Sequence, residues 1–355
     1  MCCFMITNIS LHVNGSKYKN WKQLSVNTSM TNISGAFRVS LTESIKLPIK
    51  KIEFWGGEKC ELYLNDQIVI SGYVDQIEHS YTATTHSITI SGRDKTADLA
   101  DCTLDDGPYS YSNIKLDKLA NQLVKKFGIG VNVLTAPEKV FKTFEIEQGE
   151  TIFEALERAA KFCSVLLMTD HKGNLVIDRA GRTHAKTELV EGVNIIEASA
   201  TYSFNERFSN YYVRGQQPNT DDTFGSAAAE VEGKSYDKVI KRYRPKVIIS
   251  EGAVDIKTAT ERAAWQANIN AAKSSVCTIK VKGWEQSENR LWRENERVKV
   301  NAPQIRVFNK ELLISEVAYS LDFDGGQNTT LSLVGKNAFD KIPEIESDKS
   351  ENWKN

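Results

Sequence analysis

The feature that most constrains the fold is a two-residue alternation of apolar and polar side chains that recurs through residues 1 to about 92. Successive side chains of a β-strand point to opposite faces, so this alternation predicts strands with one buried face. Several such strands at close spacing are typical of a small barrel or sandwich. The clearest alternating sets are Ile9, Leu11 and Val13, then Phe37, Val39 and Leu41, then Cys60, Leu62 and Leu64.

After this region the periodicity changes to that of helices mixed with strands. Apolar residues recur there at helical spacing, and a Thr-x-x-Glu capping box precedes a second helical run. The predicted elements are an amphipathic helix from Leu116 to Phe127 that stops at Gly128, a helix opened by Thr151 and Glu154 and running through Cys163, and a hairpin over residues 165–179.

Strand patterns resume near residue 192, and strong helix formers predict one more helix over residues 258–275. The predicted fold class is therefore α+β and β-rich, with two similar small β-barrel domains and inserted α/β and helical modules. The predicted domains are a first β-barrel domain (1–95), an α/β insert with two helices and a hairpin (96–185), a second β-barrel domain (186–215 and 275–340), an exposed loop plus helix (216–274) and a charged tail (341–355).

Two distant segments, residues 69–94 and 313–337, share a common plan. The spacing from Val74 to Gly92 equals the spacing from Val317 to Gly335, and apolar strand residues coincide between them. A true duplication would place two similar barrels at the two ends of the chain. Most of the matches are generic strand residues, so chance similarity remains an alternative.

The stretch SGRDKTADLADC admits two interpretations. Its three aspartates and a lysine could form an acid–base or metal cluster. In the other interpretation, Gly92 ends a strand, Asp94 caps a short helix, and Asp94, Asp98 and Asp101 share a solvated face. We favour this junction between barrel and insert, so Gly92, Arg93 and Asp94 are structural or interface candidates.

A second candidate region is GWEQSENRLWRENERVKV, which combines tryptophans with arginines. Such residues could stack on nucleic-acid bases, anchor a subunit interface, or simply fill a core. Interspersed glutamates neutralise the arginines, which favours an interface or a core over a phosphate-binding groove. The candidates for a structural or interface role here are Gly283, Trp284, Trp292 and Asn295.

Composition argues against several other functions. Lys+Arg 45 against Asp+Glu 46 leaves a net charge of -1, without the basic excess usual in nucleic-acid binders. The six cysteines lack C-x-x-C spacing, and none of the five histidines stands in an H-E-x-x-H or H-x-x-H arrangement, so no metal site is indicated. The sequence also contains no P-loop and no G-x-S-x-G motif. We expect no catalytic residue, no cofactor, no metal and no membrane insertion, and we expect synthesis in a reducing cytosol.

In their order along the chain, these segments resemble the baseplate hub proteins of Mu-like contractile-tailed phages, which include 43 kDa tail proteins and late-control-like proteins of prophages. The segments that carry the resemblance are ISGRDKTADLADC, FGIGVNV, FEIEQGETIFEALERAAKFCSVLLMTDHKGNLVIDR, EGVNIIEASATYSFNERFSNYYVRGQ, KVKGWEQSENRLWRENERVKV and ELLISEVAYSLDFDGG. Only the first few residues, the 215–238 loop and the tail fall outside it.

This resemblance implies a structural protein of the virion tail baseplate, made in the host cytoplasm. It implies a homotrimeric ring with two barrels per subunit that joins the sixfold tail tube to the threefold central spike and contacts other baseplate proteins. DNA would contact the ring only in transit through its lumen. Two alternatives stay open: a tail-associated peptidoglycan hydrolase, and a module that binds DNA or a host surface. The phage, prophage or bacteriocin context also stays open.

Overall fold

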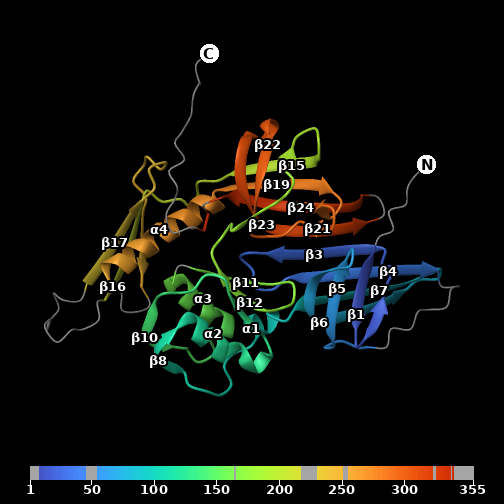
Figure 1. Cartoon of the computed structure of the whole chain (residues 1–355), viewed down its shortest axis with the longest axis horizontal. Helices are drawn as coiled ribbons and strands as arrows, with labels where there is room; N and C mark the ends of the chain where they lie inside the picture. The colour runs from blue at the N-terminus through green and yellow to red at the C-terminus, as the bar shows by residue number, and fades with distance from the viewer. Residues whose placement is uncertain are drawn as a thin grey trace, which may run out of the picture. The chain divides into compact units, whose positions relative to one another are not determined.

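The computed structural model describes residues 8–44, 54–163, 165–216, 230–250, 255–322, 325–336 and 338–339 (Figure 1). The chain divides into two compact units. The first comprises Met1–Thr201 and Val276–Val334, and the second comprises Tyr202–Ser275 and Gly335–Asn355. The predicted charged tail, 341–355, lies outside the described residues. Within the described part of the chain, no helix is long and apolar enough to cross a membrane.

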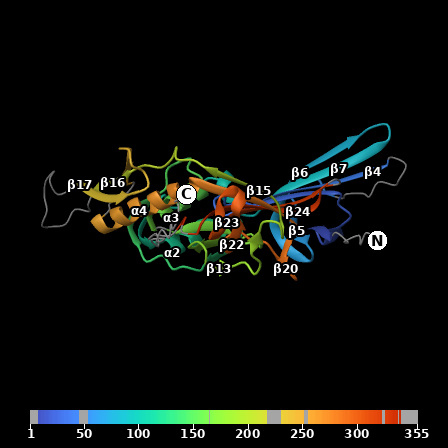
Figure 2. The same ribbon diagram turned by 90° about the horizontal axis from the view of Figure 1, so that it is seen from above.

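One 14-stranded sheet dominates the first unit, and the chain is β-rich with fewer helices, as predicted. Figure 2 shows β4, β6 and β7 of this sheet side by side. Beside the main path, β22 (Glu296–Ala302) pairs with β23, β13 (Thr183–His184) and β14 (Leu189–Val190). The main path runs in the order β15 (Ile195–Tyr202), β19 (Ser275–Lys282), β24 (Gly326–Gly335), β23 (Val307–Asp322), β3 (Gln23–Ser29), β4 (Ala36–Ser44), β7 (Thr85–Asp94), β6 (Gln67–Tyr81), β5 (Lys59–Leu64), β1 (Ile9–Val13) and β2 (Ser16–Tyr18).

The alternating pattern predicts the buried faces correctly. In β3 and β5, buried residues alternate with more exposed ones along the strand. Asn65 and Asp66 turn the chain from β5 into β6 with φ values of 48 and 60°. Asparagine and aspartate tolerate this left-handed conformation, and two such residues in succession match the twist of a tight hairpin.

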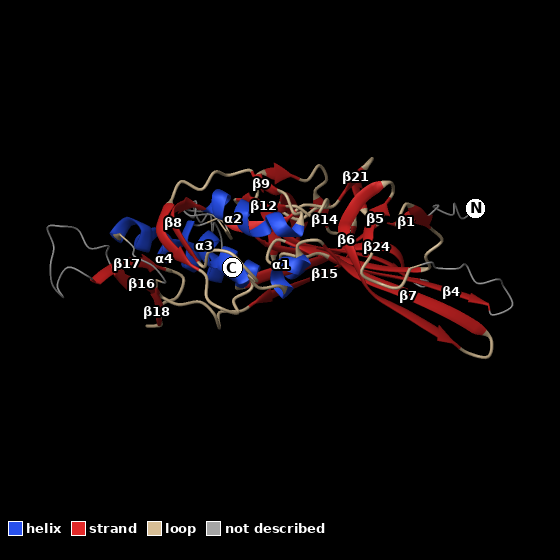
Figure 3. Cartoon of the chain, turned by 90° about the horizontal axis from the view of Figure 1, so that it is seen from below, coloured by secondary structure: helices blue, strands red, loops and turns tan. Residues whose placement is uncertain are grey.

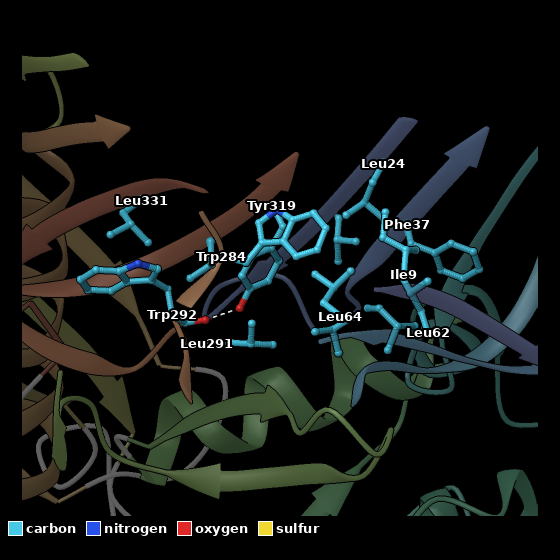
Figure 4. Packing of buried hydrophobic residues seen from close by; sticks show 14 of the residues in the cluster. Ile9, Leu24, Phe37, Leu62, Leu64, Trp284, Leu291, Trp292, Tyr319 and Leu331 are labelled. Atoms are coloured by element: carbon cyan, nitrogen blue, oxygen red, sulfur yellow. Dashed lines mark hydrogen bonds between the residues drawn. The ribbon is translucent and has the colours of Figure 1, made fainter. Parts of the chain in front are cut away.

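The large sheet contains an N-terminal strand set (β1–β7) and a C-terminal strand set (β13–β15, β19 and β22–β24). The two sets join in a single sheet because β3 pairs with β23. In this antiparallel pairing Val26 lies opposite Tyr319, although 293 positions separate them in the sequence. Both side chains belong to one hydrophobic core that draws residues from both sets, as Figure 4 shows for Leu24, Leu64, Trp284 and Tyr319. Pairing among the described strands gives an open sheet and no closed barrel.

The predicted α/β insert has its own hydrophobic core, and both predicted helices and the hairpin are confirmed. The capping box forms as predicted: Thr151 N donates to Glu154 Oε2 at 2.9 Å, and Glu154 N donates to Thr151 Oγ1 at 3.2 Å. Figure 3 shows the helices gathered with β8, β9 and β12. The elements are α1 (Ala97–Asp101), β8 (Ser110–Lys115), α2 (Leu116–Val124), β9 (Val131–Val133), β10 (Val140–Glu145), α3 (Ile152–Cys163), β11 (Leu166–Thr169) and β12 (Leu175–Asp178).

The second unit packs one helix on a three-stranded sheet. The predicted helix is confirmed as α4 (Ile256–Lys273). Of the exposed loop expected ahead of it, residues 217–229 and 251–254 lie outside the described residues, and the described remainder contains two strands, so the loop prediction is wrong there. A Cβ on Gly233 would lie 2.2 Å from the backbone carbon of Ala259, so only glycine lets the helix approach this closely. The sheet order is β17 (Glu230–Tyr236), β16 (Asn210–Gln216) and β18 (Pro245–Ile249).

Candidate functional site

The first group of candidate residues lies where β7 leaves the large sheet. Gly92 faces Val74 in the β6·β7 register, and a Cβ at Gly92 would lie 2.1 Å from the carbonyl oxygen of Tyr73 and 2.7 Å from the Phe37 ring. Backbone oxygen cannot move away without separating the strands. Gly92 is therefore required by close approach of neighbouring chain segments rather than by any chemistry.

Arg93 ties this sheet to the first helix of the insert. Its Nε donates to Asp75 at 2.8 Å, and its Nη2 donates to Asp101 on α1 at 2.8 Å. These bonds raise the pKa of the Arg93 guanidinium, and the hydrogen bond from Arg93 lowers the pKa of Asp101. A charged cluster that is satisfied internally in this way supports the junction interpretation of SGRDKTADLADC.

Asp94 is the one charged member of this stretch that is buried, with 2% of its surface exposed. Because Asp94 is buried, the prediction that it lies on a solvated face is wrong. The prediction that it caps α1 is also wrong, because the N-cap residue of this helix is Thr96. Gly35 N donates to Asp94 Oδ2 at 2.5 Å, and Thr96 N donates to Oδ1 at 2.9 Å. The Thr96 hydroxyl lies within hydrogen-bonding reach of both Oδ1 and the Ile33 carbonyl. Asp94 therefore fastens the 33–35 segment to the junction.

The titration of Asp94 gives a testable pH dependence. Burial, which outweighs the bonds from Thr96 and Gly35, raises its pKa from an ordinary 3.8 to about 6. The folded state thus binds more protons than the unfolded state between these values, so stability falls as pH rises through this window. We expect the unfolding free energy to lose roughly 2.4 kcal/mol from this group between pH 4 and 7.

The matched variant is Asp94→Asn, which is neutral throughout and lacks this contribution. Urea unfolding at pH 4, 5, 6 and 7 should show that the wild type loses stability relative to Asp94→Asn as pH rises. The amide nitrogen cannot accept the bonds from Gly35 or Thr96, so an offset common to all pH values is also expected. Parallel profiles for the two proteins would show that Asp94 does not titrate as described.

The second group of candidates surrounds a tight hairpin, β20 (Glu285–Ser287) and β21 (Arg290–Leu291). Trp284 and Trp292 are 1% and 2% exposed, so the structure places both rings in the hydrophobic core of the first unit. Trp284 Nε1 donates to the Ser320 carbonyl at 3.0 Å, and the Tyr319 hydroxyl donates to the Trp292 carbonyl. Their burial indicates a packing role, while a role in subunit contacts stays a prediction.

Gly283 and Asn295 stand at the two ends of this segment, and both adopt left-handed backbone, with φ values of 79 and 64°. Asn295 also connects three parts of the chain. Its N–H donates to the Ile314 carbonyl at 2.9 Å, and its Oδ1 accepts from Gly181 N at 2.6 Å. Asparagine suits this position because it tolerates the left-handed conformation and its amide can still bond backbone.

The hairpin loop of the insert and the segment around Arg293 together line a cavity of about 410 Å³. The sequence does not indicate that these two parts of the chain lie close together. The lining of the cavity includes His171 and Arg293. Burial lowers the pKa of His171 to about 4, against the opposing effect of Glu294, so the imidazole is neutral at pH 7. Asp170, also in the lining, accepts from the backbone of Lys172 and Asn174 at 2.9 and 2.8 Å. Asp170 is the one carboxylate among these lining residues, so the lining offers no carboxylate pair of the kind a glycosidase uses.

The described residues contain no cluster of three or more His, Cys, Asp or Glu side chains that could hold a metal ion. Burial raises the pKa of the Cys60 thiol to about 12 and that of Cys277 to about 11, so neither is a thiolate at neutral pH. What the candidate residues do have in common is that they hold segments together: strand to strand, sheet to helix, and one strand set to the other.

Comparison with known proteins agrees with this assembly of elements. A 43 kDa tail protein of prophage MuSo2 from Shewanella oneidensis superposes with a TM-score of 0.83 and 34% identity, over 94% of this chain and 99% of that one. A tail protein of Neisseria meningitidis MC58 has a TM-score of 0.77 at 18% identity, over 94% and 98%. The fold is therefore that of phage tail proteins.

Family models match three segments of the chain. Residues 8–94 match the Mu phage baseplate assembly protein GpP-like N-terminal domain, residues 96–179 the second domain of baseplate hub protein gp44-like proteins, and residues 255–342 the fourth domain of GpP. Baseplate hub protein gp44 of Escherichia phage Mu is 30% identical over 352 residues, which is 97% of this chain and 92% of that protein.

The chain belongs to the family of Mu-like phage baseplate hub proteins. It is a structural component of a phage or prophage tail baseplate and not an enzyme, because its relatives across nearly its whole length are structural hub and tail proteins.

Proposed function

We propose that three copies of this chain form a closed ring that joins the tail tube to the central spike of a contractile tail. In this proposal the protein is made in the host cytoplasm, assembles with the other baseplate proteins, and meets DNA only in transit through its lumen. Each chain contributes two similar modules, one from each strand set, so three chains present six similar modules to a sixfold tube and three equal chains to a threefold spike.

The observation that carries the proposal is the likeness of the two long hairpins, β6–β7 and β23–β24. When the segments are aligned as their spacing indicates, Val74 and Val317 are both completely buried. Ile90 and Leu333 are likewise both completely buried, and Ile88 and Leu331 are 3% and 0% exposed. Equal burial at equal spacing supports two copies of one module, although the sheet that they share is open.

Mass in solution tests the trimer. Light scattering of the purified protein should give three times the 39.8 kDa chain mass over a range of concentrations. A monomer throughout that range would contradict the self-association on which the ring depends. A trimer would support it and would leave the contacts with tube and spike to be tested by co-assembly.

Binding to DNA tests the proposed transit. A near-neutral chain should bind duplex DNA weakly at physiological salt, because phosphate contacts by lysine and arginine dominate such affinity. A gel shift at several salt concentrations measures this. Tight binding that collapses as salt rises would instead favour a DNA-binding module. A peptidoglycan turbidity assay should show no clearing.

A further inference from the structure

The chain from the end of β17 into β18 carries a local excess of positive charge, although the whole chain has a net charge of -1. Residues 238–246, KVIKRYRPK, contain five lysines and arginines and no acidic residue. We call residues 238–246 the basic segment. It lies in the second unit, where β17 and β18 flank β16 (Figure 3). A balanced total therefore conceals one strongly basic stretch of surface.

The basic segment is fixed to the rest of the second unit by backbone groups. Near its start, the N–H of Val239 donates to Asp237 Oδ1 at 3.0 Å. Near its end, the N–H of Arg244 donates to Ser209 Oγ at 2.9 Å, and the N–H of Ser209 donates to the Arg244 carbonyl at 2.9 Å. A segment that is already ordered loses little conformational entropy when a partner binds to it.

Four of the five cations project from this fixed backbone as exposed side chains: Lys238, Lys241, Arg242 and Lys246. Within the part of the chain that the structure describes, none of these four side chains forms an ion pair with a carboxylate. The adjacent carboxylate of Asp237 accepts two bonds from Arg207 instead, at 2.8 and 3.0 Å. The four exposed charges therefore remain available to an anionic partner.

The fifth cation, Arg244, has a structural role. Its side chain is half-buried, its Nη2 donates to the Asn205 carbonyl at 2.8 Å, and its guanidinium lies 5.2 Å from the centre of the Phe208 ring. We therefore leave Arg244 out of the proposed contact.

The chemistry of the basic segment favours a phosphate polymer over a protein surface or a lipid bilayer. Its large exposed apolar side chains are Val239 and Tyr243, which is little for the apolar centre of a stable protein interface or for a membrane anchor. Val247 and Ile249 are also exposed, but successive strand side chains alternate, so they face the side of the sheet opposite Lys246. Phosphate contacts require charge and reach, which lysine and arginine supply, and a tyrosine hydroxyl can add a further bond.

We infer that the basic segment contacts the phosphate backbone of double-stranded DNA without reading its sequence. This inference rests on the proposed function for its partner, because DNA is the polyanion that the proposed transit brings past this chain. Four phosphate contacts give a slope of about −3.6 when the logarithm of the binding constant is plotted against the logarithm of the salt concentration. The affinity then falls roughly 150-fold between 50 and 200 mM salt. Binding is thus measurable at low salt and weak at physiological salt, so the DNA is contacted but not retained.

Fluorescence anisotropy of a labelled DNA duplex of mixed sequence, titrated with the full chain at several salt concentrations, tests the contact. The variant combines Lys238→Gln, Lys241→Gln and Arg242→Gln, three exposed residues without a carboxylate partner in the described chain. We expect its slope to fall to about −0.9, because one phosphate contact remains. At 50 mM salt its affinity should be lower than that of the wild type by about 100-fold or more.

The matched control removes the same number of charges from exposed lysines of the first unit: Lys22→Gln, Lys59→Gln and Lys142→Gln. It should keep the wild-type slope and affinity, because the position of the charges decides the contact and the total charge does not. Circular dichroism checks that both triple variants are folded. If the basic-segment variant fails to fold, the double variant Lys241→Gln with Arg242→Gln replaces it, with an expected slope of about −1.8.

Three results would overturn the contact: a wild type that does not bind the duplex at 50 mM salt, a basic-segment variant that binds like the wild type, or a control variant that loses as much affinity. Poly-L-glutamate or anionic phosphatidylglycerol vesicles that displace the duplex at equal charge concentration would also overturn it, in favour of an acidic protein or a lipid surface.

These outcomes are distinct from those of the mass measurement. A monomeric wild type that binds the duplex with the expected slope would overturn the ring and support the contact. A trimeric wild type whose DNA binding is unchanged in the basic-segment variant would overturn the contact alone.

Discussion

Replacing Trp284 with alanine should lower the free energy of unfolding of the first unit by about 3–5 kcal/mol, the range for truncating a buried large aromatic side chain. The indole is 1% exposed and lies in the core shared by the two strand sets. Its removal leaves a cavity and also leaves the Ser320 carbonyl without the donor now 3.0 Å away. Few other single changes remove as much buried contact from this core.

Urea unfolding followed by circular dichroism measures the effect, at one protomer concentration because association also stabilises the folded state. The control is Phe308→Ala in the same unit, where the ring is 60% exposed and the change should be within about 0.5 kcal/mol of zero. Equal losses for the two variants would show that burial of Trp284 does not support the core in the way described.

Replacing Asp237 with alanine should destabilise the second unit by about 3 kcal/mol, as expected when one member of a largely buried ion pair is removed. Arg207 Nε and Nη2 donate to the Asp237 carboxylate at 2.8 and 3.0 Å. The two side chains are 12% and 8% exposed, so the remaining guanidinium would lack an anion in a poorly solvated place. The penalty comes mainly from this uncompensated charge.

Hydrogen exchange of the β16 and β17 amides reports on this unit separately from the large sheet. Asp237→Ala should accelerate their exchange strongly. The double variant Arg207→Leu with Asp237→Leu should be milder, because it removes both charges together. Unchanged exchange in Asp237→Ala, or a double variant that is worse than the single one, would contradict a stabilising buried pair.

Several parts of the fold could be predicted because their causes are local. The helix beginning at Leu116 follows from apolar spacing, and the one beginning at Ile152 follows from the Thr-x-x-Glu capping box at Thr151 and Glu154. The turn at Asn65 and Asp66 follows from residues that tolerate positive φ. Family membership was also accessible, since several modest motifs in a specific order are distinctive together.

Other features depended on contacts between distant residues. The pairing of Val26 with Tyr319 makes one sheet from two strand sets, and no local pattern states which strand of one set meets which strand of the other. Asp94 was expected on a solvated face because it lies about one helical turn from Asp98, which in turn lies about one turn from Asp101. It is buried instead, and the bonds that it accepts from Gly35 N and Thr96 N offset only part of the cost of that burial. The strands β17 and β18 lacked a strong pattern; β17 packs against α4, and β18 pairs with β16.

The sequence alone determined the alternation of strands, the local caps and turns, and the resemblance to Mu-like baseplate hubs, because each is encoded by neighbouring residues or by their order. Only the tertiary structure decided that both strand sets share one core and that Trp284 and Trp292 are buried. Burial and strand pairing depend on which distant segments come together, and that is a property of the folded chain as a whole.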